Sequence, residues 1–294
     1  MTTGDSPAGA RRRLRLAIRK LREAAGLTQG HVAENLSWSI SKVNRIENGE
    51  VTISRTDLQA LLWSLGVDDE QETARLLEDA RLSREKGWWD RPEYRAHLSQ
   101  TTRQLIQFES EASTIRSFQT AVFPGLLQTR DYADAMIGDI SGDMPADTRS
   151  IRLEVRMLRQ ENLRKLSPRP KHLVILDEFV LQRVIRSLQV TAQQLHALAE
   201  AARDPDVIVR LLPKEASIFL QLGAFMIYDI KDEENAILYR EGMATGSIVQ
   251  HVETVEKYRI RFEQMWERCL NEEASLSAIE ARYALLRADM HRHL

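Results

Sequence analysis

The sequence predicts two domains of different classes, an all-α N-terminal domain followed by a mixed α+β C-terminal domain. Over the first 67 residues, apolar side chains recur at the spacing of amphipathic helices. Further on, short apolar runs of the kind found in buried strands alternate with long charged helical stretches. A chain of 294 residues is long enough to bury the cores of both domains.

Composition indicates a globular protein of a reducing compartment. The hydrophobic fraction is 43% and the charged fraction 29%, which excludes a disordered chain. The one cysteine, Cys269, excludes an internal disulfide framework and favours a cytoplasmic location. No apolar run approaches the roughly 20 residues that cross a bilayer, so we expect no membrane association. The N-terminus, MTTGDSPAGARRR, lacks the apolar stretch of a secretory signal.

Charge is distributed unevenly along the chain. Residues 1–60 hold 10 Lys/Arg against 6 Asp/Glu, a net charge of +4, whereas the rest holds 31 against 37, a net charge of −6. We call the basic N-terminal part of the chain the head and the acidic remainder the body. A basic head is suited to binding a polyanion, although an ordinary charged surface gives the same numbers.

Four amphipathic helices are predicted over residues 11–66. The first, RRRLRLAIRKLREAAG, ends at Gly26, and Thr28 can cap the second. The turn SWS follows, Ser39 can cap the third helix, ISKVNRIENG, and Gly66 ends the fourth. The positions expected to face the core are Leu14, Ile18, Leu21, Val32, Ala33, Leu36, Val43, Ile46, Leu58, Leu61, Leu62 and Leu65. This is the pattern of a helix-turn-helix.

The pattern also resembles a known family over about residues 11–67. The residues that carry the resemblance are Thr28-Gln29, Val32-Ala33, Leu36, Ser39, Ser41, Val43, Arg45-Ile46-Glu47 and Gly49. They are similar to the phage-repressor-like (Xre) DNA-binding domain, in which the third helix lies in the major groove and its first residues read bases. The resemblance therefore implies a double-stranded DNA operator as partner of a domain at 1–67.

Carried onto this sequence, the resemblance implies two sets of contacts. Ile40, Ser41 and Arg45 are the candidates for base contact, since an arginine can grip guanine O6 and N7, with about 1–3 kcal/mol of discrimination. Phosphate contacts would position the domain without specifying sequence. The full set of candidate DNA-binding residues is Gln29, Ser39, Ile40, Ser41, Lys42, Asn44, Arg45 and Asn48, with Gln29, Lys42 and Asn48 assigned to phosphates and Asn44 open to either use. The alternative is a docking module that touches no nucleic acid, in which Arg45 and Glu47 are solvated or form a local ion pair.

A connecting helix and hinge are predicted at 68–92. The run DDEQETARLLEDARLSREK reads as a helix capped by Asp68 or Asp69, and GWWDRPEY breaks it. We interpret Trp88 and Trp89 as a packed hinge in preference to a ligand platform, and place the second domain at 93–294.

The body should contain four or five strands among its helices. Strand-like runs are IRSFQTAV (115–122), KHLVILDE (171–178), DVIVRLLP (206–213) and a hairpin of GAFMIYDI (223–230) with NAILYREG (235–242). Helices are expected at 103–114, after Thr129, at 145–166, at 191–203, at 247–270 and at 275–290.

The body resembles a second family over about residues 88–285. The segments FESEASTIRSFQTAVFPGLLQTRDYADAMI, RMLRQENL, LDEFVLQR, QQLHALAEAARDPDVIVRLLP and FEQMWERCLNEEASLSAI look like the uncharacterised C-terminal domain of a large actinobacterial family of antitoxin-like transcriptional regulators. In that family an Xre domain precedes this body, and members are often associated with a small partner protein. The resemblance supplies no firm ligand or site.

No residue pattern in the sequence indicates catalysis, a metal site or a cofactor site. Asp177-Glu178 lies at the end of a strand-like run, which suggests acid–base chemistry, but acidic residues at a helix N-terminus explain the pair better. His172, His196 and His251 lack metal-ligand spacing. Cys269 lies on an amphipathic helix, which favours a buried structural thiol.

The remaining interpretation is that the C-terminal domain binds a ligand or a partner. The hairpin and the segment FPGLLQT could line a small-molecule pocket or a peptide groove, with Phe123, Pro124, Leu127 and Gln128 as candidate residues, although core packing explains the same residues. The helix at 247–270 has near-heptad apolar spacing, which fits core burial or a dimer seam.

Two functional hypotheses follow. The first is a dimeric, sequence-specific transcriptional regulator whose body responds to a small partner protein or small-molecule effector, since one helix-turn-helix reads too few base pairs to be selective. The alternative is an antitoxin-like protein that sequesters a small partner and binds DNA for autoregulation.

Overall fold

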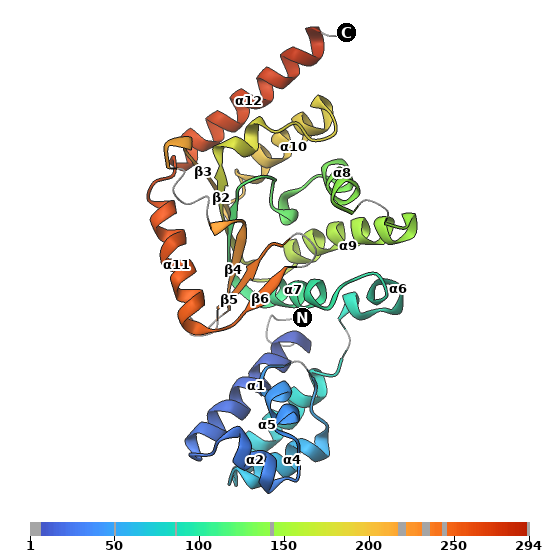
Figure 1. The fold of residues 1–294 in the computed structure, drawn as a ribbon, viewed down its shortest axis with the longest axis vertical. Coiled ribbons are helices and arrows are strands. Elements are labelled where there is room, and N and C mark those ends of the chain that lie inside the picture. Colours follow the sequence, from blue (N-terminus) through green and yellow to red (C-terminus); the bar gives the residue numbers. More distant parts are fainter. Residues whose placement is uncertain are drawn as a thin grey trace. The chain divides into compact units, whose positions relative to one another are not determined.

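The computed structural model describes residues 7–49, 51–85, 87–141, 144–216, 222–230, 236–242 and 246–292. Its contacts divide the chain into two compact units, Met1–Arg91 and Pro92–Leu294 (Figure 1). The first unit is helical and the second combines helices with a six-stranded sheet, which confirms the predicted fold class. Among the described residues, no helix has the length and apolarity needed to cross a membrane.

Five helices form the first unit around one hydrophobic core. They are α1 (Pro7–Ala24), α2 (Gln29–Asn35), α3 (Ile40–Glu47), α4 (Arg55–Ser64) and α5 (Glu70–Leu82). Thr28, Ser39 and Asp69 cap α2, α3 and α5 by accepting hydrogen bonds from backbone N–H groups of the first turn. Of the twelve predicted core positions, ten are buried, and the other two, Leu21 and Leu36, pack half-buried against the same core.

The connecting helix, predicted to run from Asp68 to Lys86, is α5 (Glu70–Leu82), which begins and ends inside the first unit. α5 packs along α1 and places Leu76 and Ala80 in the same core as α2, α3 and α4. A 3₁₀ turn, Trp88–Asp90, follows it, where the rings of Trp88 and Trp89 meet edge to face at 5.8 Å and Trp89 is buried. Residues 69–82 therefore contribute to the stability of the head in addition to carrying the chain onward.

The second unit is built on one mixed sheet with strand order β3-β2-β1-β4-β5-β6. The strands are β1 (Ala112–Gln119), β2 (Lys171–Asp177), β3 (Val207–Leu212), β4 (Phe225–Ile230), β5 (Ile237–Arg240) and β6 (Ser247–Val249). β1, β2 and β3 run parallel, and β4, β5 and β6 add antiparallel, with Phe118 opposite Ile175 and Phe225. The sheet has six strands, so the prediction of four or five strands is wrong. The strand that was missed is β6, which lies in the segment expected to form one helix from 247 to 270. Pairing with β5 makes these three residues a strand, and local periodicity does not reveal such pairing.

Helices cover both faces of this sheet (Figure 1). The helices of this unit are α6 (Pro92–Arg95), α7 (Gln100–Glu111), α8 (Arg130–Ser141), α9 (Ala146–Arg164), α10 (Leu188–Ala201), α11 (Val252–Trp266) and α12 (Glu272–Arg292), with 3₁₀ turns at Gly125–Leu127 and Glu178–Gln182. α11 covers one face, where Val255, Phe262 and Met265 pack on Phe118 and Ile175. Most near-heptad positions of this segment therefore pack in the core of their own chain, whereas Val252 leaves 62% of its surface exposed.

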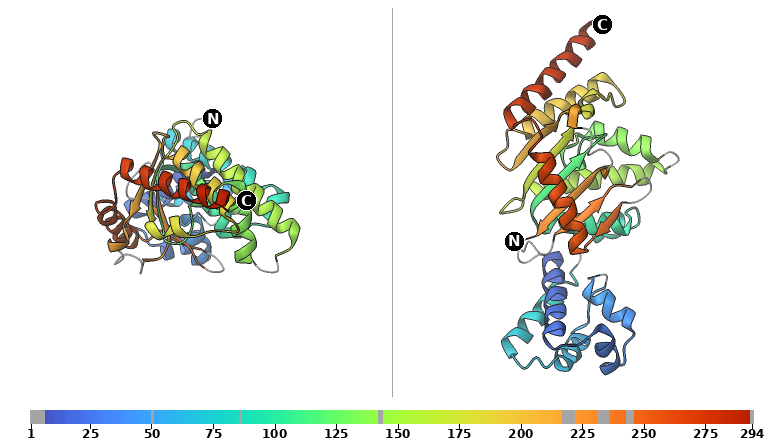
Figure 2. Two further views of the ribbon diagram at one scale, coloured as in Figure 1. Left: turned by 90° about the horizontal axis from the view of Figure 1, so that it is seen from above. Right: turned by 60° about the vertical axis from the view of Figure 1, so that its left-hand side comes forward.

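The opposite face of the sheet holds two further groups of buried side chains. Ile115, Met226 and Tyr228 pack against α7, because alternate residues of a strand point to opposite faces. Toward β2 and β3, α10 and α12 lie side by side over the sheet (Figure 2) and share one core with Phe123 and Tyr132.

Candidate nucleic-acid interface and ligand pocket

The third helix of the head divides its residues sharply between core and solvent. Val43 and Ile46 are buried, whereas Ser41, Asn44 and Arg45 are exposed. Ile40, at the first turn, leaves 61% of its surface in water. The three residues predicted to read bases therefore lie on the outward face of α3.

A buried carboxylate fixes α3 to its neighbours. Glu47 accepts hydrogen bonds from Arg22 Nε at 2.6 Å and Nη2 at 3.0 Å, and from Gln29 Nε2 at 2.8 Å. The hydrogen bond to Glu47 raises the pKa of Arg22, because it favours the charged guanidinium. One side chain thereby joins α1, α2 and α3. Sequence reasoning missed this role, since Glu47 was named only within the motif of the resemblance and was placed in solvent or in a local ion pair only under the docking-module alternative.

Amide side chains extend this network to the surface. Asn44 Nδ2 donates to Gln29 Oε1 at 3.4 Å, and Asn48 Nδ2 donates to Asn44 Oδ1 at 2.8 Å. Three of the predicted DNA-binding side chains are therefore ordered by one another within the protein.

Lys42 is held in a different way. Its Nζ lies 3.1 Å from Asp57 Oδ2 of α4 and 3.8 Å from the centroid of the Trp38 ring. Ser39, another predicted DNA-binding residue, uses its hydroxyl to accept the Lys42 backbone N–H at 3.1 Å. The ammonium of Lys42 is therefore partly neutralised by Asp57.

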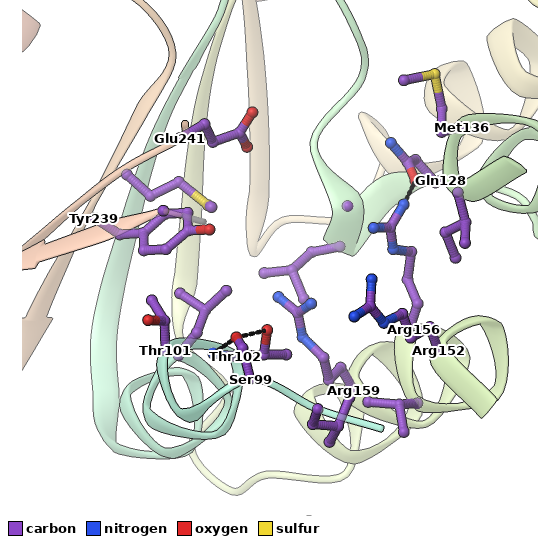
Figure 3. Close-up of a pocket in the computed structure, with 18 of the residues that line it drawn as sticks. Ser99, Thr101, Thr102, Gln128, Met136, Arg152, Arg156, Arg159, Tyr239 and Glu241 are labelled. Carbon is purple, nitrogen blue, oxygen red and sulfur yellow. Dashed lines mark hydrogen bonds between the residues drawn. The ribbon is translucent and has the colours of Figure 1, made fainter. Parts of the chain in front are cut away.

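A cavity of about 340 Å³ lies in the C-terminal unit, on the α7 and α9 side of the sheet (Figure 3). Its walls come from α7, the segment after β1, α8, α9, the β4–β5 hairpin and Gly246. Of the four candidate residues in FPGLLQT, Phe123 and Gln128 line the cavity. Pro124 and Leu127 do not, and Leu127 packs into the core under α10.

The polar side of the cavity is formed by arginines that sequence reasoning did not select. Arg152, Arg156 and Arg159 lie at spacings of four and three residues on α9, so they share one face of that helix. Arg159 forms a two-point ion pair with the buried Glu109 of α7, with Nε 2.9 Å from Oε2. Burial alone would lower the pKa of Arg159, but the Glu109 carboxylate raises it overall.

Arg156 has a different environment. Its Nη1 donates to the amide oxygen of Gln128 at 2.7 Å, a neutral partner. Burial, together with the nearby Arg159 cation, lowers the pKa of Arg156 to about 10. In Figure 3 the guanidinium groups of Arg156 and Arg159 point into the cavity, opposite Tyr239.

The residues considered for catalysis have structural partners. Asp177 caps the 3₁₀ turn Glu178–Gln182 by accepting the Phe179 N–H at 2.9 Å, as the helix-terminus interpretation predicts. His172 is buried, with Nε2 at 2.8 Å from Ser117 Oγ, and burial lowers its pKa to about 4. Burial also raises the pKa of the Cys269 thiol to about 12. Within the described ranges, no three His, Cys, Asp or Glu side chains gather in a way that could hold a metal ion.

These two units define a class and a family. The head has the geometry of a helix-turn-helix, and residues 13–76 match the family model described as Helix-turn-helix domain, which supports a DNA-binding regulator. Residues 102–281, more than half of the chain, match the model described as Domain of unknown function (DUF5753), and the chain belongs to this family. Searches of curated proteins and of solved structures gave no match. Neither description specifies the phage-repressor-like subfamily or an antitoxin, so both stay predictions.

Proposed function

We propose that this protein is a dimeric, sequence-specific transcriptional regulator of the cytoplasm, which reads operator DNA with the outward face of α3. Its C-terminal unit senses an effector in the α7–α9 cavity, and the protein acts by binding alone, without catalysing a reaction. The observation that carries the DNA-binding role is the exposed row of Ile40, Ser41 and Arg45 on a helix that Glu47 fixes from beneath.

The chemistry of this row suits the major groove. An exposed aliphatic side chain such as Ile40 can contact a thymine methyl group, and an arginine such as Arg45 can donate two hydrogen bonds to guanine. Because Glu47, Val43 and Ile46 hold the backbone of α3, little ordering is needed when the helix enters the groove.

Dimerisation follows from the amount of DNA that one head can read. A single recognition helix contacts only a few base pairs, which is too few for selectivity. Two heads bound to half-sites about one helical turn apart contact enough base pairs to be selective. The operator is therefore expected to be an inverted repeat.

The test is to select bound fragments from the host genome with the full-length protein and to measure affinities for the recovered sequence. Arg45→Ala should weaken binding to that sequence about tenfold to a hundredfold, and binding to unrelated DNA far less, because a base contact of about 1–3 kcal/mol is lost. Arg75→Ala is the matched control, since Arg75 lies on α5 in an ion pair with Glu72.

Two outcomes would contradict the proposal. Unchanged specific affinity in Arg45→Ala would mean that another surface reads the bases. Recovery of fragments without a shared motif, bound with an affinity that depends only on salt, would remove sequence specificity from the function.

A further inference from the structure

The α7–α9 cavity holds a cation without an anionic hydrogen-bonding partner. Among the residues that the structure describes, the partner of the Arg156 guanidinium is the amide oxygen of Gln128. Buried or half-buried cations are usually paired with a carboxylate, because transfer out of water disfavours their charge. The lowered pKa of Arg156, about 10, has the same physical cause.

Glu241 and Glu109 attract the Arg156 cation through space and so oppose the lowering of its pKa, but in the part of the chain that the structure describes neither accepts a hydrogen bond from it. The Glu109 carboxylate is engaged by Arg159 through two contacts. Glu241 is exposed and accepts a hydrogen bond from Gln119 Nε2 at 3.1 Å. Arg152, which is also exposed, adds a further positive charge to the lining, and its Nε donates to the His97 carbonyl at 3.2 Å. The α9 wall is therefore electropositive and has donors to offer.

The remaining lining is suited to an apolar body with a polar end. Leu105, Phe123, Leu126, Val155 and Met226 contribute apolar surface. Ser99 Oγ and Thr102 Oγ1 lie 2.9 Å apart in the wall, so one of the two hydroxyl protons stays available to an incoming oxygen (Figure 3). A volume of about 340 Å³ is near the lower end of the range for small-molecule sites.

We infer that this cavity binds a small organic acid, an apolar body that ends in one carboxylate or phosphate group, with the anionic group received by Arg156. The planar guanidinium presents two parallel N–H donors, which match both oxyanions better than they match a neutral amide. The inference names a ligand class for the effector site of the proposed function and depends on that function only for its regulatory consequence.

The experiment uses the full-length protein and a set of carboxylic acids and phosphate monoesters, each paired with its neutral primary amide or alcohol. Ligand-induced thermal stabilisation identifies acids that bind, and calorimetric titration gives their Kd. Comparing carboxylates with phosphates of the same body distinguishes the two sources of the anionic group.

Three variants assign the binding to Arg156. Arg156→Gln should weaken the best acid at least about tenfold, because charge-assisted hydrogen bonds are lost. Arg156→Lys, which keeps the charge without the two-donor geometry, should fall between this variant and the wild type. Arg164→Gln removes an exposed arginine from the same helix and should leave the Kd unchanged. Melting temperatures without ligand show whether each variant is folded.

The inference is overturned if no acid stabilises the wild type more than its neutral counterpart, or if folded Arg156→Gln and Arg156→Lys bind the best acid as tightly as the wild type does. Operator affinity, measured separately, reports on the proposed function. A wild type that binds its operator but no acid removes only this inference, and a wild type that binds an acid but no specific operator removes only the DNA-binding role.

Discussion

Removal of the buried Glu47 carboxylate should substantially lower the free energy of unfolding of the first unit. In Glu47→Ala, Arg22 loses both of its contacts to the carboxylate and Gln29 loses its acceptor. The Arg22 side chain is only 11% exposed, so water cannot fully replace the lost partner. The variant therefore leaves a largely buried cation without its main counter-charge.

The expected magnitude follows from this geometry. Breaking a buried ion pair from one side costs about 3–5 kcal/mol. We expect about 3 kcal/mol here, at the lower end, since Arg22 Nη1 keeps its hydrogen bond to the Leu27 carbonyl at 2.9 Å. For a unit of this size, each kcal/mol corresponds to about 4–8 °C in melting temperature, so the loss should be at least about 12 °C.

Hydrogen exchange on the full-length chain isolates this effect. The slowest backbone amides of α1 and α3 report the free energy of unfolding of the first unit, while those of the sheet report the second. Glu23→Ala is the matched control, because Glu23 also contacts Arg22, at 3.5 Å, but is exposed. An exposed pair contributes about 0–1 kcal/mol. Equal protection of α1 and α3 in the two variants would refute the assignment of Glu47 as the residue that joins these helices.

Two further predictions concern buried groups of the second unit. Because burial lowers the pKa of His172 to about 4, the folded chain favours the neutral ring, and unfolding takes up a proton below pH 6.5. The free energy of unfolding should therefore fall by about 3 kcal/mol as the pH falls from 6.5 toward 4. Urea titrations across that pH range should show a smaller loss of unfolding free energy in His172→Gln than in the wild type. An equal loss of unfolding free energy in the two proteins would contradict the reasoning. Because burial raises the pKa of Cys269 to about 12, iodoacetamide at pH 8 should alkylate the thiol slowly in the folded protein and rapidly in urea. Equal rates, measured by mass spectrometry, would show that the thiol is accessible in the fold.

Much of the head could be predicted from local sequence. Helix caps at Thr28, Ser39 and Asp69 depend on residues three positions apart or fewer, and apolar spacing identifies the buried faces directly. The contacts of Glu47 could not be predicted in this way, since Arg22 is 25 residues away in sequence and only the packing of α1 on α3 brings them together.

The cavity was predictable in part. The FPGLLQT segment and the β4–β5 hairpin were both identified as candidate walls, and residues of both line the cavity. The arginines of α9 were identified only as part of the long charged helix expected at 145–166. Their spacing beside the buried Val155 is the signal that could have found them, but it becomes decisive only when α7 places Glu109 against Arg159. The strand β6 was missed because three residues carry too little periodicity.

The division of α3 between inward and outward residues has an evolutionary consequence. The side chains that hold the helix in place, Val43, Ile46 and Glu47, are different from those that face the solvent at Ile40, Ser41 and Arg45. Substitutions at the outward positions alter the chemistry presented to a partner with little effect on folding, since exposed changes usually shift stability by less than about 0.5 kcal/mol. Duplicated copies of such a gene can therefore diverge in target preference while they inherit the same scaffold.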